Sequence, residues 1–191
     1  IEDMDKLKSV LVERFNTTLF STLGVERNEQ YTKQRFCNDF AKLSILRTAQ
    51  SDIILRQFVN HELPVGREIE PRGEVIEVEH ILPKNPSEGW FADSFSNDED
   101  DDERYYRRFI NRLSNQTLID KKLNNQMKNR PFEEKKSDFS ESQIAMSRNL
   151  ADLEDWNPEQ IEERGVALAN QALEIWPLIS MIEESLNDAE E

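Results

Sequence analysis

Residues 75–83 read Val-Ile-Glu-Val-Glu-His-Ile-Leu-Pro, and this stretch decides how the rest of the chain is interpreted. β-Branched residues alternate roughly with acids over residues 74–79, which predicts a strand. The strand leads into a carboxylate beside a histidine, Glu79 and His80, and Pro83 follows where the strand ends. A second short strand is predicted at residues 115–119, so we expect a small β-hairpin near the histidine.

Helical patterns precede this hairpin. Apolar residues recur at three- and four-residue steps over residues 3–22 and 31–47, which predicts two amphipathic helices. Ser51 or Asp52 is expected to cap a third helix, which ends before Pro64. Residues 1–70 are therefore interpreted as a helical packing layer.

The segment between the two strands is predicted to be a loop. Residues 83–103 contain two prolines, one glycine and a run of acids, and we expect Trp90 and either Phe91 or Phe95 to anchor part of it. The acidic stretch, residues 97–103, is interpreted as a solvated loop tip. The alternative is that it shields a basic site from stray DNA.

Further helices are predicted after the first strand. The first is a short basic helix at 104–112, and the second is a helix at 123–136 that Pro131 kinks or restarts. A third runs from a Ser140 cap to about 153. Asn157 caps the last helix, and Pro158 begins it. The tail after Leu186 is acidic and is expected to be disordered.

The charge of the chain is unevenly distributed. The 191 residues carry a net charge of −15, which argues against a nucleic-acid partner. Residues 104–136, however, hold ten basic and three acidic side chains, a net charge of +7. This basic window follows the histidine, so it could hold phosphates, although we expect such binding to be weak and sensitive to salt.

Several classes of protein are excluded or disfavoured by composition. Cys37 is the single cysteine, so no internal disulfide forms and a reducing, cytoplasmic setting is favoured. No apolar run approaches the roughly 20 residues that span a bilayer, so no membrane partner is expected. The chain begins at Ile1 rather than Met, which we interpret as the C-terminal fragment of a larger protein.

The residues around the hairpin suggest metal-assisted cleavage of a phosphodiester. Glu79 and Asn124 can supply a carboxylate and an amide oxygen, which are ligands that Mg²⁺ accepts while keeping several waters. Mn²⁺ is an alternative ion. His80 is then free to take a proton from water, because its ordinary pKa lies near working pH. Asn115 would position the loop or the His80 ring by a hydrogen bond to the backbone.

Other interpretations of these residues stay open. His80 alone could be a half-buried strand histidine, Asn115 could be a turn residue, and Asn125 or Asn129 could replace Asn124 as the metal ligand. A set of cations near the hairpin would contact phosphates or would simply be solvated helix charges: Arg108, Lys128, Arg130, Lys135 and Lys136.

Four blocks of the sequence resemble one known family. Val78-Glu79-His80-Ile81-Leu82-Pro83 is similar to the HxxP signature of the C-terminal nuclease domain of GmrSD-type restriction endonucleases. Residues 114–119 are similar to its Gly-Asn-Leu-Thr-Leu-Leu block. Asn124 with residues 129–135 is similar to its third block, and Trp156-Asn157-Pro158 to its tail. The chain departs from the family in having Glu79 where many members have Asp, and Ser114 before Asn115.

The resemblance implies a fold and an activity. The fold would be mainly α with a small β-hairpin. An HNH ββα-metal motif at residues 71–136 would be embedded between two helical segments. These are the helical packing layer before it and, after it, the C-terminal helices with the acidic tail at 137–191. The activity would be a Mg²⁺-dependent DNA endonuclease or nickase acting in phage defence, on phage or modified DNA. An NTP-binding domain would precede this segment in the whole protein.

A second class of function remains. The overall acidic charge favours a non-catalytic interaction module, either a degenerate nuclease or an acidic surface that mimics DNA and binds a partner.

Overall fold

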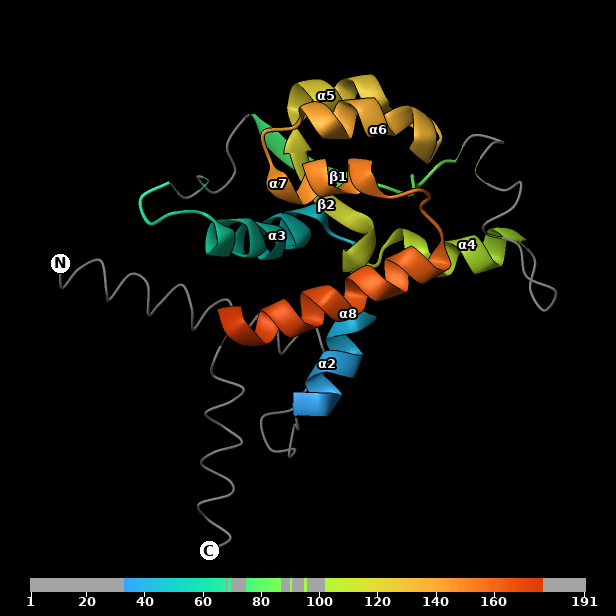
Figure 1. Ribbon diagram of the computed structural model, residues 1–191. Coiled ribbons are helices and arrows are strands. Elements are labelled where there is room, and N and C mark those ends of the chain that lie inside the picture. The colour runs from blue at the N-terminus through green and yellow to red at the C-terminus, as the bar shows by residue number, and fades with distance from the viewer. Residues whose placement is uncertain are drawn as a thin grey trace, which may run out of the picture.

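The computed structural model describes residues 33–67, 69, 75–86, 90, 95 and 102–176. Strand β1 (Ile76–His80) pairs in antiparallel register with β2 (Gln116–Asp120), so that Glu79 faces Thr117 and His80 faces Gln116. Helix α5 (Lys121–Met127) begins directly after β2. The predicted hairpin followed by a helix is therefore confirmed, within an otherwise helical protein (Figure 1).

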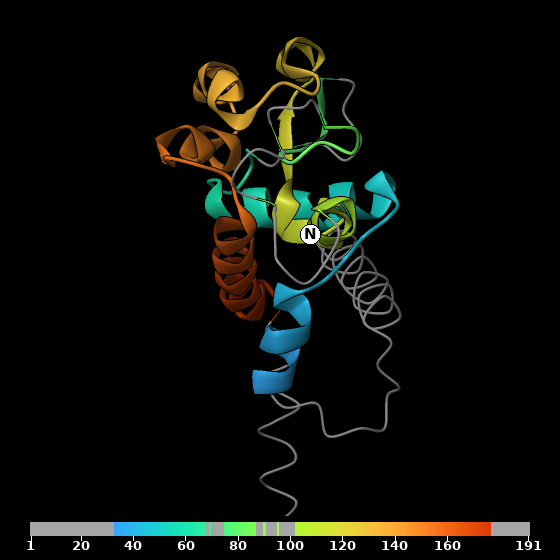
Figure 2. The ribbon, with the colours of Figure 1, turned by 90° about the vertical axis from the view of Figure 1, so that its right-hand side faces the viewer.

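Helices surround the hairpin. They are α2 (Lys33–Ala41), α3 (Thr48–Glu62), α4 (Asp102–Ile110), α6 (Phe132–Glu141), α7 (Ala145–Arg148) and α8 (Pro158–Ile175), with the 3-10 turns η2 (Leu113–Asn115) and η3 (Asn149–Asp152). Figures 1 and 2 show α5 and α6 on one side of the hairpin and α3, α8 and α2 on the other.

The strand β2 separates two apolar clusters because consecutive side chains of a strand point to opposite faces. Leu118 belongs to the cluster formed with α2, α3 and α8, where Phe40, Phe58 and Trp176 meet. Ile119 belongs to the cluster formed with α4, α5 and α6. Both faces of β2 are thus buried, and the hairpin forms a central layer of the core.

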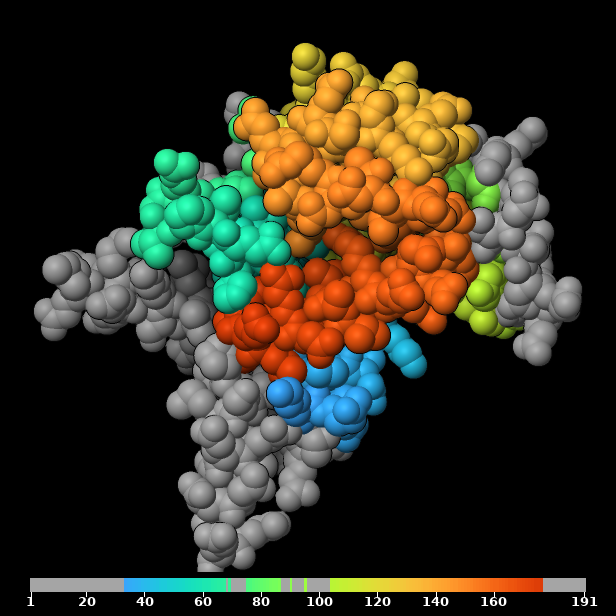
Figure 3. Space-filling model, viewed as in Figure 1, coloured from blue at the N-terminus to red at the C-terminus, as the bar shows by residue number. Residues whose placement is uncertain are grey.

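The longest described helix, α8, crosses the molecule beneath the hairpin in the view of Figure 1. Its side chains lie against those of α2 (Figure 3). Asn157 caps it, since its side-chain oxygen accepts from the backbone N–H groups of Glu159 and Gln160 at 3.0 and 3.2 Å. Gly165 lies at the crossing, where a Cβ would be only 2.3 Å from the carbonyl oxygen of Ala41. The absence of a side chain at Gly165 therefore permits this close approach of the two helices.

Several predicted elements are confirmed. The 104–112 helix corresponds to α4, the predicted restart at Pro131 separates α5 from α6, and Asn157 caps the last helix. Trp90 and Phe95 are buried, as expected of loop anchors. The predicted helix at 3–22, the acidic stretch before Asp102 and the tail after Leu186 lie outside the described residues.

Two helix predictions are wrong in their limits. Helix α2 ends at Ala41 rather than near residue 47, because the backbone of Leu43 and Ile45 bonds instead to residues 111–113, with N···O distances of 2.7 Å. Helix α3 begins at Thr48, and no side chain caps it; Ser51 is buried within it.

The helix predicted from Ser140 to about 153 is also wrong. Ser140 lies in the last turn of α6, where its hydroxyl donates to the carbonyl of Ser137 at 2.7 Å. The following residues form the short helix α7 and the turn η3 instead.

Among the helices that the structure describes, none is long and apolar enough to cross a membrane.

Candidate functional site

The site is built on the two faces of strand β1. Ile76 and Val78 pack against the cluster shared by α2, α3 and α8. The alternating residues Glu77 and Glu79 project toward α5 and α6, where each meets a polar side chain. Asn124 of α5 donates from its amide nitrogen to Glu77 at 2.8 Å, and Lys135 of α6 donates to Glu79 at 2.7 Å.

Lys135 is a lysine with no exposed surface. Its ammonium donates to the Glu79 carboxylate at 2.7 Å and to the backbone carbonyls of His80 and Ile81 at 3.3 and 3.1 Å. Burial lowers the pKa of Lys135, and the carboxylate of Glu79 opposes that shift. Burial likewise raises the pKa of Glu79, and Lys135 opposes it. The ammonium thus joins a carboxylate to the backbone at the end of β1.

Asn115 holds the same turn from the other side. Its side chain is fully buried, and its amide nitrogen donates to the carbonyls of Leu82 and Ile110 at 3.0 and 2.9 Å. Its amide oxygen accepts from the N–H of Leu82 and from the indole of Trp156, both at 2.9 Å. All of these partners are internal, so the side chain of Asn115 holds the turn after β1. Its place among the catalytic residues stays a prediction.

His80 is the last residue of β1, and its side chain is nearly enclosed, with 9% of the residue exposed. Burial, reinforced by the positive charges of Lys84 and Lys135, lowers the pKa of His80 to about 4. The ring is therefore neutral at physiological pH, which is the form that accepts a proton. Its Nε2 is buried and has no hydrogen-bond partner among the described residues. A buried nitrogen without a protein partner is uncommon, and water, an ion or a substrate group commonly satisfies it.

The predicted phosphate-binding cations differ in their surroundings. Lys128 is exposed after α5, and Arg108 is exposed on α4, where it lies 5.8 Å from the Tyr105 ring. Lys136 is partly exposed and lies 2.7 Å from Glu133. Arg130 donates to the Met127 carbonyl at 3.0 Å and pairs with Asp138.

Lys135, which the sequence groups with the phosphate-binding cations, is buried in this structure. Among the five cations predicted to contact phosphate, Lys135 is the one whose side chain is completely buried. Its ammonium pairs with the Glu79 carboxylate inside the protein. Two adjacent lysines in a helix look alike in sequence, and only packing separates the buried Lys135 from the partly exposed Lys136.

The structure brings some of the predicted site residues together. Lys135 contacts both Glu79 and the backbone of His80, whereas the hydrogen-bond partner of Asn124 is Glu77 rather than Glu79. Sequence reasoning missed Glu77 as a member of the site. Its position two residues before Glu79, on the same face of a strand, was the signal that could have identified it.

The residues on this face suit a hard divalent cation. Glu77, Glu79 and Asn124 offer carboxylate and amide oxygens, which are the ligands that Mg²⁺ and Mn²⁺ prefer. Within the described residues, no cluster of three His, Cys, Asp or Glu side chains has the arrangement of a metal site. A cation here would therefore depend on the asparagine oxygen and on water as well as on the carboxylates.

The described site is thus a hairpin followed by a helix, with acids and a neutral histidine at the end of its first strand. The sequence matches the family of GmrSD restriction endonucleases, C-terminal domain, over residues 5–171. The match covers most of the chain, and the protein belongs to this family. Membership makes it a nuclease domain of the restriction-endonuclease type, whose substrate class is DNA. A search of curated proteins found no match.

We expect removal of the buried ammonium to destabilise the protein. In Lys135→Met the Glu79 carboxylate keeps its burial but loses its counterion, so the free energy of unfolding should fall by about 3 kcal/mol. Adding Glu79→Gln removes the unpaired charge. The free energy of unfolding of the double variant should therefore be about 1–3 kcal/mol higher than the value expected if the two single losses simply added. Urea denaturation measures all four proteins.

Lys136→Met is the matched control for this cycle. Its ammonium pairs with a mostly exposed carboxylate, so the change should stay within about 0.5 kcal/mol. Equal losses in Lys135→Met and Lys136→Met would contradict the role assigned to the buried ion pair.

The depressed pKa of His80 predicts a dependence of stability on pH. Between about pH 4 and 6.5 the unfolded chain binds a proton on this histidine that the folded protein does not, so stability is lost as pH falls through this window. A pKa difference of one unit corresponds to about 1.4 kcal/mol. Between pH 7 and pH 4.5, the free energy of unfolding of the parent should therefore fall by roughly 2–3 kcal/mol more than that of His80→Asn. Denaturation with a chelator present measures both profiles, and parallel profiles would exclude the enclosed neutral histidine.

Proposed function

We propose that this chain is a metal-dependent DNA endonuclease or nickase domain of the HNH, ββα-metal class. The observation that carries the proposal is the end of β1, where a neutral histidine with an unpartnered Nε2 adjoins a carboxylate-bearing strand face and the helix that follows the hairpin. Membership in a restriction-endonuclease family supports the same reaction class.

In this proposal the oxygen donors and the histidine have separate roles. Glu79 and Asn124 would hold one Mg²⁺ or Mn²⁺, with Glu77 beside them. When bound, the ion would act as a Lewis acid on the scissile phosphate and stabilise the leaving oxygen. His80 accepts a proton from the attacking water at Nε2, which its neutral ring permits. Asn115 and Lys135 fix the backbone on both sides of this histidine, so their contribution is positional.

The substrate would be held by the basic surface around the hairpin. Arg108 and Lys128 are exposed, and Arg130 and Lys136 are partly exposed, so phosphate contacts by these residues are part of the proposal. We further propose that the target is phage or modified DNA, and that an NTP-binding domain of the whole protein acts with this one in the cytoplasm. A basic window in an acidic protein should make binding sensitive to salt.

A plasmid-cleavage assay with Mg²⁺ or Mn²⁺ tests the role of His80. His80→Ala should lower the cleavage rate by about 10²- to 10⁴-fold, the usual contribution of a general base. His61→Ala changes the other histidine of the chain, which lies in the last turn of α3, and should cleave like the parent. Undiminished metal-dependent cleavage by His80→Ala would refute the assignment.

A non-catalytic interaction module is the second candidate function. The net charge of −15 and the enclosure of His80 favour it. An interaction module should not cleave plasmid DNA with any divalent ion, and Glu79→Ala should leave its binding unchanged. Metal-dependent cleavage by the parent that Glu79→Ala abolishes would exclude this candidate.

A further inference from the structure

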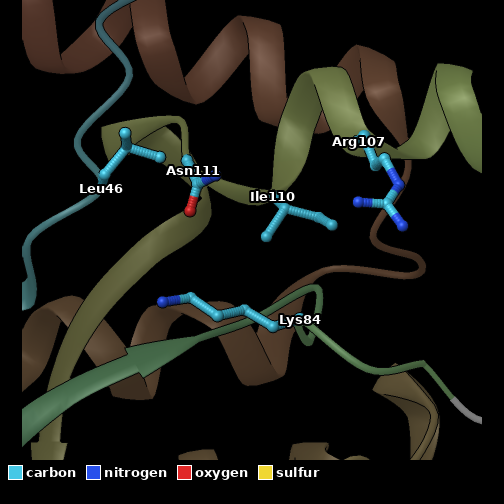
Figure 4. Close-up of a pocket in the computed structure, with 5 residues that line it drawn as sticks. All are labelled: Leu46, Lys84, Arg107, Ile110 and Asn111. Carbon is cyan, nitrogen blue, oxygen red and sulfur yellow. The ribbon is translucent and has the colours of Figure 1, made fainter.

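A pocket of about 360 Å³ opens between the turn that follows β1 and the helix α4. Its lining combines two cations, two aliphatic side chains and one amide: Lys84, Arg107, Leu46, Ile110 and Asn111. Figure 4 shows Lys84 along one wall, facing Ile110 and Asn111 on the other. The volume falls within the roughly 300–1,000 Å³ typical of ligand pockets.

Two of the pocket residues, Lys84 and Asn111, are linked to the candidate catalytic histidine or to its partner across the hairpin. Lys84 follows His80 by four residues, and its charge acts on the histidine ring. His80 pairs with Gln116 across the hairpin, and the Gln116 amide donates to the carbonyl of Asn111 at 3.2 Å. A ligand in the pocket would therefore lie next to the group bound at the end of β1.

The chemistry of the lining matches a nucleotide. Ammonium and guanidinium groups bind phosphate, the guanidinium through paired N–H donors. Leu46 is 74% exposed, which is unusual for a large aliphatic side chain, and it stands at the pocket edge with Ile110. Aliphatic groups favour the flat face of a base or sugar, and a side-chain amide can bond to a base edge.

We propose that this pocket receives one nucleotide of the DNA strand next to the scissile phosphate, with Leu46 against its base. The charged ends of Lys84 and Arg107 point apart in Figure 4, so they would contact the two phosphates that flank this nucleotide. The proposal rests on DNA being the substrate and assigns a subsite that would set strand position and nucleotide preference. Neither Lys84 nor Leu46 belongs to the groups assigned to proton transfer or to the cation.

Binding of the complete chain to single-stranded DNA tests the subsite without any cleavage. Fluorescence anisotropy in the presence of a chelator compares a deoxythymidine oligonucleotide with an abasic oligonucleotide of equal length, over a range of salt concentrations. Lys84→Met and Arg107→Met should each reduce the slope of log affinity against log salt by about 0.7 on both strands. Arg35→Met, a charge loss on α2, should leave the slope unchanged.

The aliphatic wall has its own readout. Leu46→Ser should weaken binding of the thymidine strand about fivefold, with no change in salt slope and none for the abasic strand. The proposal would be overturned if Leu46→Ser weakened binding of both strands equally. It would also be overturned if Lys84→Met and Arg107→Met left the salt slope unchanged, as Arg35→Met should. Tight binding of free thymidine 5′-monophosphate that the same variants abolish would overturn the assignment to a DNA strand.

The outcomes for binding and cleavage separate the two proposals. If the parent binds DNA through the pocket but never cleaves it, the subsite stands and the nuclease assignment fails. If the parent cleaves DNA with a divalent ion while the pocket variants bind like the parent, the nuclease assignment stands and the subsite fails.

Discussion

A lysine without exposed surface must have its charge balanced inside the protein, and this constraint determines the geometry at the end of β1. Lys135 meets it with the Glu79 carboxylate and the carbonyls of His80 and Ile81. Asn115 binds both backbone groups of Leu82 from the opposite side. The backbone around the histidine is therefore fixed by residues far away in sequence, and the loss of any one of them would leave a buried polar group unsatisfied.

This fixed turn separates two kinds of surface. Glu77, Glu79 and Asn124 present oxygen donors on the side of α5 and α6, whereas Lys84 and the residues of α4 present cations and aliphatic groups around the pocket. The proposed metal-assisted cleavage would use both surfaces, since the phosphate requires an electrophile and the rest of the strand requires a cationic surface. Both surfaces adjoin the hairpin, whose strand β2 is buried on both faces.

Local signals explain which parts were predictable from sequence. Alternation identified the strands, Pro131 marked the helix restart, and Asn157 marked the last cap, because each acts through nearby backbone. The end of α2 was not predictable, because residues 43–45 leave the helix to bond with residues 111–113. The site shows the same division. Glu79 and His80 stand out by their order in the strand, but the burial of Lys135 and the pairing of Asn124 with Glu77 arise only from packing.

We propose that the face bearing Glu79 and Asn124 holds a divalent cation beside the fixed turn, and a titration with Mn²⁺ followed by NMR tests this proposal. Because Mn²⁺ is paramagnetic, it broadens the resonances of nearby nuclei. If the cation binds there, substoichiometric Mn²⁺ should first broaden the side-chain amide of Asn124 and the backbone amides of Glu77 to His80, and Glu79→Gln should abolish this broadening. Broadening confined to other acidic parts of the chain, unchanged by Glu79→Gln, would contradict it.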